Sequence, residues 1–203
     1  MEREIISYNF VANQAKIFLH KFYRAKGKSI KFPILIEKMA DFLGYEIVFS
    51  EMEKSINAKT EMLEKQIVIN NYLNPKQHPE MNGRYKFTVA HEIAHIVLHE
   101  QKFIKMYETG ILQNDYSVLD KMVQNPRYEK EAEIFAGNLI LPRELLKKEF
   151  TQRFGTNRIV LKNNYFIPLE AEDYFSFMQK KTGTSQQALQ IAMKEAFILQ
   201  VAS

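Results

Sequence analysis

The chain has 203 residues, a formal net charge of +4 and no cysteine. This length suits one compact domain with a substantial core, or one domain with a small appendage. The absence of cysteine excludes disulfides and thiolate metal ligands, and it fits a reducing cytoplasm. The N-terminal residues lack the apolar core of a signal peptide, and no apolar run of about 18 residues is available to cross a membrane. We therefore expect a cytoplasmic protein that does not contact membranes.

Two helices are predicted at the N-terminal end of the chain. The first covers Asn13–Lys26, where apolar residues recur at helical spacing and Gly27 marks the end. The second covers Phe32–Leu43 and is closed by Gly44. Each helix has one apolar face, which we expect to pack on the core.

Short strands are predicted after these helices. Tyr45–Ser50 and Lys65–Asn70 have the composition of strands, and Ile56–Thr60 is a candidate third strand. The segment Asn71–Asn82, rich in Asn and Pro, is predicted to be a loop.

The run Tyr85–His99 predicts a helix that is buried over most of its surface. Apolar residues fall on nearly every side, and polarity is concentrated at His91, Glu92, His95 and His99. Burying these side chains is costly unless something satisfies them. The alternative to a metal site is a core helix whose histidines are merely hydrogen-bonded.

Residues 91–95 of this helix form an HExxH motif. His91 and His95 lie one turn apart on the same face, so both imidazoles can reach one metal ion. Glu92 flanks the open side of that ion, where a water molecule would bind. Zinc lowers the pKa of such a water to about 7, and the carboxylate can take its proton as the water attacks a carbonyl. The motif therefore predicts a metallopeptidase.

This interpretation gives one of the predicted strands a role. In thermolysin-like enzymes an edge strand beside the cleft holds the substrate backbone extended by strand addition. We expect Lys65–Asn70 to be that edge.

A catalytic zinc site has three protein ligands and one open position, so a third ligand is required. The longer HExxHxxGxxH pattern would supply a histidine, but the chain has Leu98 and Gln101 at the two decisive positions. The third ligand must then come from another element. A second predicted helix, between Pro126 and Pro142, supplies the candidates.

On this second helix, Glu129 and Glu133 are four residues apart and share a face, whereas Glu131 points elsewhere. If the helix packs against the HExxH helix, Glu129 could ligate the metal. Glu133 could accept an N–H from a liganding histidine and so fix its tautomer. The alternative is a solvated first turn, which the helix dipole favours for acidic residues. We favour the ligand interpretation for Glu129 and the solvated interpretation for Glu131.

A peptidase also needs a group besides the metal that stabilises the oxyanion. Tyr107, Tyr116, Tyr128 and His99 are the candidates, and the sequence does not choose among them. His99 lies two turns beyond His91, too far along the axis to join the same coordination sphere. We expect it to support a metal ligand or to lie at the end of the helix.

The C-terminal part of the chain carries two more predicted helices, Tyr174–Lys181 and Thr184–Met193, with the outline of a helix-turn-helix. The second helix has almost no basic residues, so we expect it to pack or to contact a protein rather than to read DNA. Basic residues between Arg143 and Lys162 are interpreted as an ordinary solvated face rather than a docking site for an acidic partner or DNA. We divide the chain into a domain at 1–150 and a helical extension at 151–203.

Two stretches resemble the signatures of the ImmA/IrrE family of metallo-endopeptidases. The run Tyr85–His99 is similar to the family's RFTLAHELGHLLLH, and residues 129–142 are similar to its ExxAnxFAaxLLmP. Residues 31–49 also resemble the family's opening helix and strand. The resemblance covers roughly residues 30 to 145.

Position by position, the resemblance implies that His91, His95 and Glu129 are metal ligands and that Glu92 is the general base. The chain departs from the family pattern at two places. Position 94 is alanine instead of the usual glycine, which a helix tolerates. Glu133 stands where the family commonly has Asn or Asp, and its side chain reaches farther.

The expected fold is α+β, a mostly helical zincin-like metallopeptidase domain with a small antiparallel or mixed sheet beside the HExxH helix. The resemblance implies cleavage of a specific intracellular protein, a helix-turn-helix transcriptional repressor of stress-response or mobile-element genes, without direct nucleic-acid binding. Two imidazoles and a carboxylate suit Zn²⁺ best, while Mn²⁺ and Fe²⁺ also fit. One alternative is a catalytically silent metal-binding module that controls a repressor by binding alone. Another is a metal hydrolase of small molecules.

Overall fold

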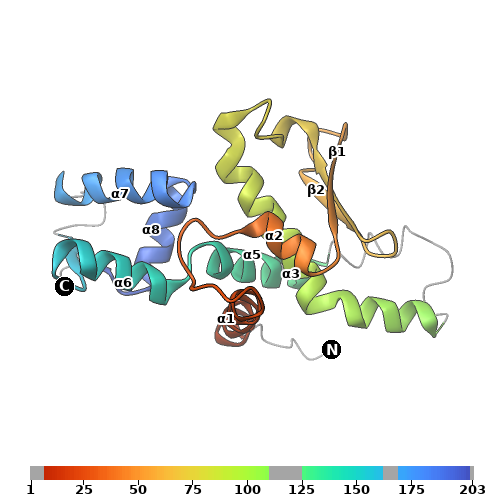
Figure 1. Cartoon of the computed structure of the whole chain (residues 1–203), viewed down its shortest axis with the longest axis horizontal. Coiled ribbons are helices and arrows are strands. Elements are labelled where there is room, and N and C mark those ends of the chain that lie inside the picture. The colour runs from red at the N-terminus through yellow and green to blue at the C-terminus, as the bar shows by residue number, and fades with distance from the viewer. Residues whose placement is uncertain (1–6, 110–124, 162–168, 202–203) are drawn as a thin grey trace.

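The computed structural model describes residues 7–109, 125–161 and 169–201. Helices form the body of the molecule, and a small sheet lies along one side (Figure 1). In chain order the elements are α1 (Tyr8–Ala25), α2 (Ile36–Phe42), β1 (Glu46–Ser50), β2 (Ala58–Glu61), β3 (Gln66–Asn70), the short 3₁₀ helices η1 (Asn71–Leu73) and η2 (Pro79–Met81), α3 (Asn82–Glu108), α5 (Pro126–Ile140), α6 (Arg143–Phe154), β4 (Ile159–Leu161), α7 (Leu169–Thr182), α8 (Gln186–Glu195) and β5 (Leu199–Val201). The expected α+β zincin-like class is confirmed.

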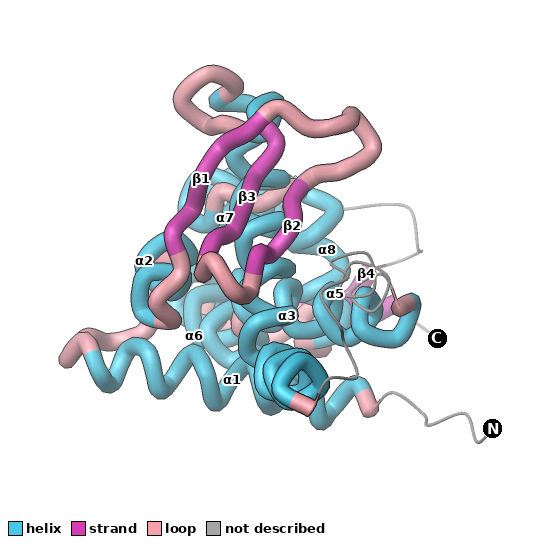
Figure 2. The backbone as a smooth tube through the Cα atoms, turned by 90° about the vertical axis from the view of Figure 1, so that its right-hand side faces the viewer, coloured by secondary structure: helices cyan, strands magenta, loops and turns pink. Residues whose placement is uncertain are grey.

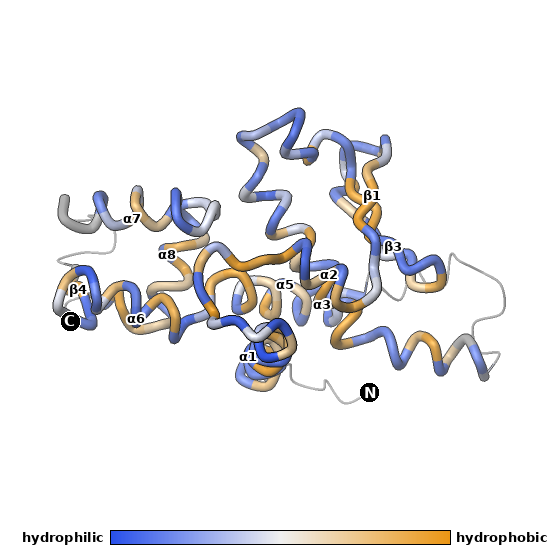
Figure 3. Tube along the Cα trace, viewed as in Figure 1, coloured by the Kyte–Doolittle hydropathy of each residue, from blue (hydrophilic) through white to orange (hydrophobic). Residues whose placement is uncertain are grey.

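The N-terminal helix α1 begins earlier than the sequence predicts because Ser7 caps it. The Ser7 side chain accepts a hydrogen bond from the Phe10 backbone N–H, which satisfies one donor of the first turn. One face of α1 is buried and packs on α5, with Phe18 and Phe135 ring centroids 6.2 Å apart. In Figure 3, hydrophobic residues gather where these helices meet. Helix α2 is shorter than predicted and begins at Ile36; Phe32 lies outside it, as expected of a residue before proline, which favours extended backbone.

The main sheet has three strands in the order β1-β3-β2 (Figure 2). β1 runs parallel to β3, and β2 runs antiparallel to it. Three consecutive β3 residues, Ile67, Val68 and Ile69, are buried, as expected of a central strand covered on both faces. The expectation that Lys65–Asn70 forms the edge of the cleft is therefore wrong. That edge is β2, which contacts α3 and whose more polar sequence, AKTE, suits an edge.

The long helix α3 runs through the middle of the molecule. The predicted loop before it contains η1 and η2, and the helix extends beyond the predicted Tyr85–His99 at both ends. Its apolar residues Val89, Ala90, Ile93 and Ala94 have no exposed surface. Helix α5 forms its most extensive contact, and both helices contribute to a single core cluster. The site described below lies in this contact.

The C-terminal helices share the same core. Phe150 of α6, Tyr174 of α7 and Leu189 of α8 are fully buried members of the cluster that also holds α3 and α5. Helix α8 begins after Ser185, whose side chain accepts from the Ala188 N–H, and it packs on α5 and α6. Residue 150, at which we divided the chain, lies inside α6. Within residues 7–109, 125–161 and 169–201, no helix has both the length and the apolarity to cross a membrane.

Candidate metal centre

Two packed helices bring the predicted ligands together. His91, Glu92 and His95 lie in the middle of α3, and Glu129 lies in the first turn of α5. Helix α5 starts here because Pro126 suits the first helical position and Asn125 accepts a hydrogen bond from the Arg127 N–H. The helix dipole also favours a carboxylate in this first turn. Local sequence therefore fixes where Glu129 sits on α5, and packing brings it to α3.

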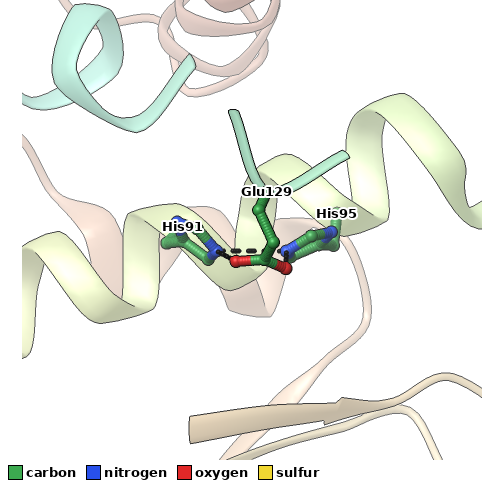
Figure 4. A group of neighbouring side chains, drawn as sticks. All are labelled: His91, His95 and Glu129. Atoms are coloured by element: carbon green, nitrogen blue, oxygen red, sulfur yellow. Dashed lines mark hydrogen bonds and ion pairs between the residues drawn. The ribbon is translucent and has the colours of Figure 1, made fainter. Parts of the chain in front are cut away.

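The three side chains converge on one point (Figure 4). The His91 Nε2 atom lies 3.1 Å from Glu129 Oε2, and His95 Nε2 lies 3.3 Å from Glu129 Oε1. The two Nε2 atoms are 3.1 Å apart. Among the described residues, these three form the group whose ligand atoms lie within 4.8 Å of one another.

These spacings match the requirements of a zinc ion. Nitrogen and oxygen donors bind zinc at about 2.0–2.2 Å, so two donors of a tetrahedral site lie about 3.3 Å apart. The Nε2 atoms of His91 and His95, 3.1 Å apart, agree with that value. Each of them also lies at a similar distance from one oxygen of Glu129, Oε2 at 3.1 Å for His91 and Oε1 at 3.3 Å for His95. The donor set of two imidazoles and one carboxylate is also one that catalytic zinc uses. The residues present therefore fit a metal ion.

The charges around the site favour cation binding. Burial alone would lower the pKa of His91, but the hydrogen bond that it donates to Glu129 and the charges of Glu92, Glu129 and Glu133 outweigh burial and raise that pKa above 6.5. Burial alone would raise the pKa of Glu129, but hydrogen bonds from His91 and His95 lower it to about 2. Glu129 is therefore ionised at every physiological pH.

The three converging side chains stand in a cleft of about 510 Å³ between α3, α5 and the segment that leads into β2. Glu92 lines this cleft and is 6% exposed. Its Oε2 atom accepts a hydrogen bond of 2.7 Å from the Thr60 hydroxyl of β2. Thr60 thus fixes one oxygen of the carboxylate beside His91. This hydrogen bond also joins the edge strand β2 to the HExxH helix beside the candidate metal centre.

Glu133 and His99 are the two residues expected to support the metal ligands, and one is half exposed whereas the other is buried. The Glu133 carboxylate lines the cleft and accepts from Lys130 Nζ at 2.9 Å, with about half of its side chain exposed. The His99 ring is buried, and its Nδ1 lies 3.3 Å from His95 Nδ1. Burial lowers the pKa of His99. Of these two residues, only His99 has a hydrogen-bond contact with one of the converging histidines.

The interpretation of Glu131 as a solvated residue is wrong. Its side chain is 14% exposed, its Oε2 lies 3.0 Å from His99 Nε2, and its Oε1 accepts from Arg127 Nε at 2.9 Å. Hydrogen bonds from His99 and Arg127 outweigh burial and lower the pKa of Glu131. The helical spacing correctly separates Glu131 from the face of Glu129. The spacing does not reveal that α3 also contacts Glu131, through His99.

Of the three tyrosine candidates, Tyr128 is the one whose side chain the structure describes. Tyr128 packs its ring on His99, with centroids 4.5 Å apart, and its hydroxyl accepts from Lys102 Nζ. It is not among the residues that line the cleft. Tyr116 and the side chain of Tyr107 lie outside the described residues. The sequence analysis did not identify Thr60, because a threonine in a short polar strand carries no motif.

Comparison with known proteins assigns most of the chain to a family. The family model described as the IrrE N-terminal-like domain, peptidase family M78, matches residues 40–176. No curated protein matches the chain. Among solved structures, a Mycobacterium tuberculosis transcriptional regulator is similar with a TM-score of 0.48 and 12% identity. That similarity covers 91% of this chain but spans only 50% of the regulator's chain. With a family match that covers well over half of its length, the chain belongs to the IrrE N-terminal-like domain family of peptidases.

Proposed function

We propose that the protein is a zinc-dependent endopeptidase that hydrolyses a peptide bond in a specific protein. The observation that carries this proposal is the convergence of His91, His95 and Glu129, whose ligand atoms lie within 4.8 Å of one another, with Glu92 in the same cleft. A core helix with merely hydrogen-bonded histidines would not need three donors at one point. It would also not need an acid beside them.

In the proposed mechanism His91, His95 and Glu129 hold the metal. When bound, zinc lowers the pKa of a nearby water and polarises the substrate carbonyl. Glu92 takes the proton of the attacking water and passes it to the leaving amine. Thr60 holds Glu92 Oε2, so we assign the proton transfer to the other carboxylate oxygen. Glu129 remains ionised throughout, because its pKa is about 2.

The substrate is proposed to bind as an extended chain along β2. This strand is at the edge of the sheet, and residues 55–60 line the cleft. Backbone groups at such an edge can pair with an added strand, which holds a peptide across the metal centre. Ile56, 40% exposed, offers an apolar contact at the same edge. We favour a peptide over a small molecule because the cleft runs beside this open strand edge.

We propose that this substrate is a helix-turn-helix transcriptional repressor inside the cell. The support is the resemblance of the two motif stretches to ImmA/IrrE peptidases, together with the family match. The alternative is a metal-binding module that controls a repressor by binding alone. An intact Glu92 in the cleft favours the peptidase, because a module that only binds has no use for a general base.

The metal site is tested by elemental analysis of the purified protein. We expect about one zinc per chain in the wild type and a loss of most of it in Glu129→Ala, because two imidazoles alone do not complete the site. Glu144→Ala is the control, since Glu144 lies on α6 and is exposed. A wild-type protein that takes up no added zinc would contradict the proposal.

Peptidase activity is tested with Glu92→Gln, which keeps the size and the hydrogen-bond acceptor of the side chain but removes the base. We expect zinc content like that of the wild type and a fall in turnover of about 10²- to 10⁴-fold. The substrate is identified by comparing new protein N-termini in cells that express wild type or Glu92→Gln. A cut inside a helix-turn-helix protein, seen with wild type alone, is the expected result. Equal release of the regulator by both proteins would support the binding module.

A further inference from the structure

A third imidazole of α3, which is buried, contacts the candidate metal site without belonging to it. His99 is 3% exposed, and its Nδ1 atom lies 3.3 Å from His95 Nδ1. Its other ring nitrogen, Nε2, lies 3.0 Å from Glu131 Oε2 on α5. The second oxygen of Glu131 accepts from Arg127 Nε at 2.9 Å. A chain of contacts therefore runs from Arg127 through Glu131 and His99 to His95.

The protons of this chain can be assigned by matching donors to acceptors. A neutral imidazole has one donor and one acceptor nitrogen. Metal binding needs the lone pair of His95 Nε2, which places the His95 proton on Nδ1, where it donates to His99 Nδ1. His99 then carries its proton on Nε2 and donates to the Glu131 carboxylate, which also accepts from Arg127. Every donor in this arrangement meets one acceptor.

The reverse arrangement is incompatible with a metal ion. If His99 Nδ1 carried the proton and donated to His95 Nδ1, the His95 proton would move to Nε2. That proton would point at the position the metal must occupy. In neutral His99, the unprotonated Nε2 would also face the Glu131 carboxylate, so two acceptors would lie 3.0 Å apart. The Glu131 carboxylate therefore selects the His95 tautomer that leaves Nε2 free.

The position of the His99 ring is held by packing as well. Its ring centroid lies 4.5 Å from that of Tyr128 and 6.3 Å from that of Phe103. Met62, Phe103 and Tyr128 form a small buried cluster separate from the main core. Tyr128, one of the oxyanion candidates, therefore packs on the His99 ring.

We propose that Arg127, Glu131 and His99 are positioning residues that set the tautomer and ring orientation of His95 for metal binding. This proposal rests on the proposed metal site. It assigns to Glu131, acting through His99, the support that the sequence analysis expected from Glu133. Supporting contacts of this kind commonly change metal affinity by about 10- to 100-fold.

The test measures zinc affinity by competition with a chromophoric chelator and the visible spectrum of the Co²⁺-substituted protein. Glu131→Leu removes the carboxylate, and His99→Phe keeps the ring packing but removes the acceptor for His95. We expect each to weaken zinc binding by about 10- to 100-fold and to alter the Co²⁺ spectrum. Glu131→Gln should recover part of the affinity, because its amide oxygen can still accept from His99.

The matched control is Glu149→Leu. Glu149 is 19% exposed and accepts from Lys181 across α6 and α7, so its loss breaks a similar inter-helix ion pair away from the metal. This variant should lower the melting temperature without changing zinc affinity. If Glu131→Leu and His99→Phe behave in the same way, their role is structural only and the positioning proposal is overturned.

A second measurement uses the wild-type protein and does not depend on the folding of any variant. Nitrogen-15 NMR of the zinc-loaded protein reports which ring nitrogen of each histidine carries a proton. We expect the proton on Nδ1 of His95 and on Nε2 of His99, and the opposite assignment for His99 would overturn the proposal. Zinc binding by the wild type separates the two hypotheses, since its absence would refute the metal site itself.

Discussion

At the scale of single residues, His91 links metal binding to pH. Its pKa is raised above 6.5 because the nearby carboxylates, Glu129 above all, outweigh the effect of burial. A proton therefore stays on His91 at a higher pH than on an ordinary histidine. A metal ion can bind only by displacing that proton. Glu129, with a pKa of about 2, offers no such competition above pH 4 or so.

We predict that zinc affinity falls as pH decreases, and that the fall begins above pH 6.5. Below the raised pKa of His91, each further pH unit should weaken the apparent affinity by about tenfold, as for the displacement of one proton. Zinc titration from pH 8.5 to 5.5 in the presence of a competing chelator measures this slope. An affinity that is constant down to pH 6 would show that His91 carries no proton there.

At the scale of elements, the residues of β2 alternate between those whose backbone groups bond to β3 and those whose backbone groups do not. The Asn70 N–H donates to the Asn57 carbonyl, and the register pairs Ala58 with Ile69 and Thr60 with Ile67. Antiparallel pairs alternate between hydrogen-bonded and non-hydrogen-bonded positions. The backbone groups of Ala58 and Thr60 therefore point away from β3. These are the groups available to an added strand.

We predict that Ala58→Pro raises the KM for the protein substrate and lowers kcat/KM by about 3- to 10-fold, the value of one lost backbone hydrogen bond. The substitution removes an N–H that is not bonded to β3, so zinc content should not change. Glu61→Ala is the control, because Glu61 lies on the same strand and pairs with Lys59 but is not among the residues that line the cleft. Equal kcat/KM values for Ala58→Pro and wild type would argue against strand addition at this edge.

The comparison of elements also shows what the sequence could and could not predict. Helix α5 was predictable from Pro126 and the apolar spacing that follows it, and the HExxH motif located the site on α3. The order of the strands was not predictable, because pairing partners depend on contacts between distant segments. Glu131 was misjudged for a related reason. Periodicity tells which residues share a face of one helix, but not how far a second helix extends across it.

At the scale of the whole molecule, the candidate metal centre lies between helices that share one continuous core. Buried residues of α1, α3, α5, α6, α7 and α8 belong to the same cluster. Phe135, fully buried in α5, contacts α1 on the side away from Glu129. Unfolding of any of these helices should therefore disturb the packing that holds α5 against α3.

We predict a single cooperative unfolding transition in which zinc release and loss of helical circular dichroism coincide. Zinc at about one hundred times its dissociation constant should stabilise the protein by about 2.7 kcal/mol, and chelation should remove that increment. Phe135→Ala should cost about 3–5 kcal/mol and lower both transitions together. Two separate transitions would instead support an independent extension at residues 151–203.

The division of the three ligands between two helices has a consequence for the newly made chain. His91 and His95 are neighbours on α3 from the moment that helix forms, but Glu129 joins them only when α5 has packed against it. A copy in which α5 has not yet packed against α3 therefore lacks a complete group of candidate ligands. The proposed peptidase activity would then be confined to copies that have reached the native state.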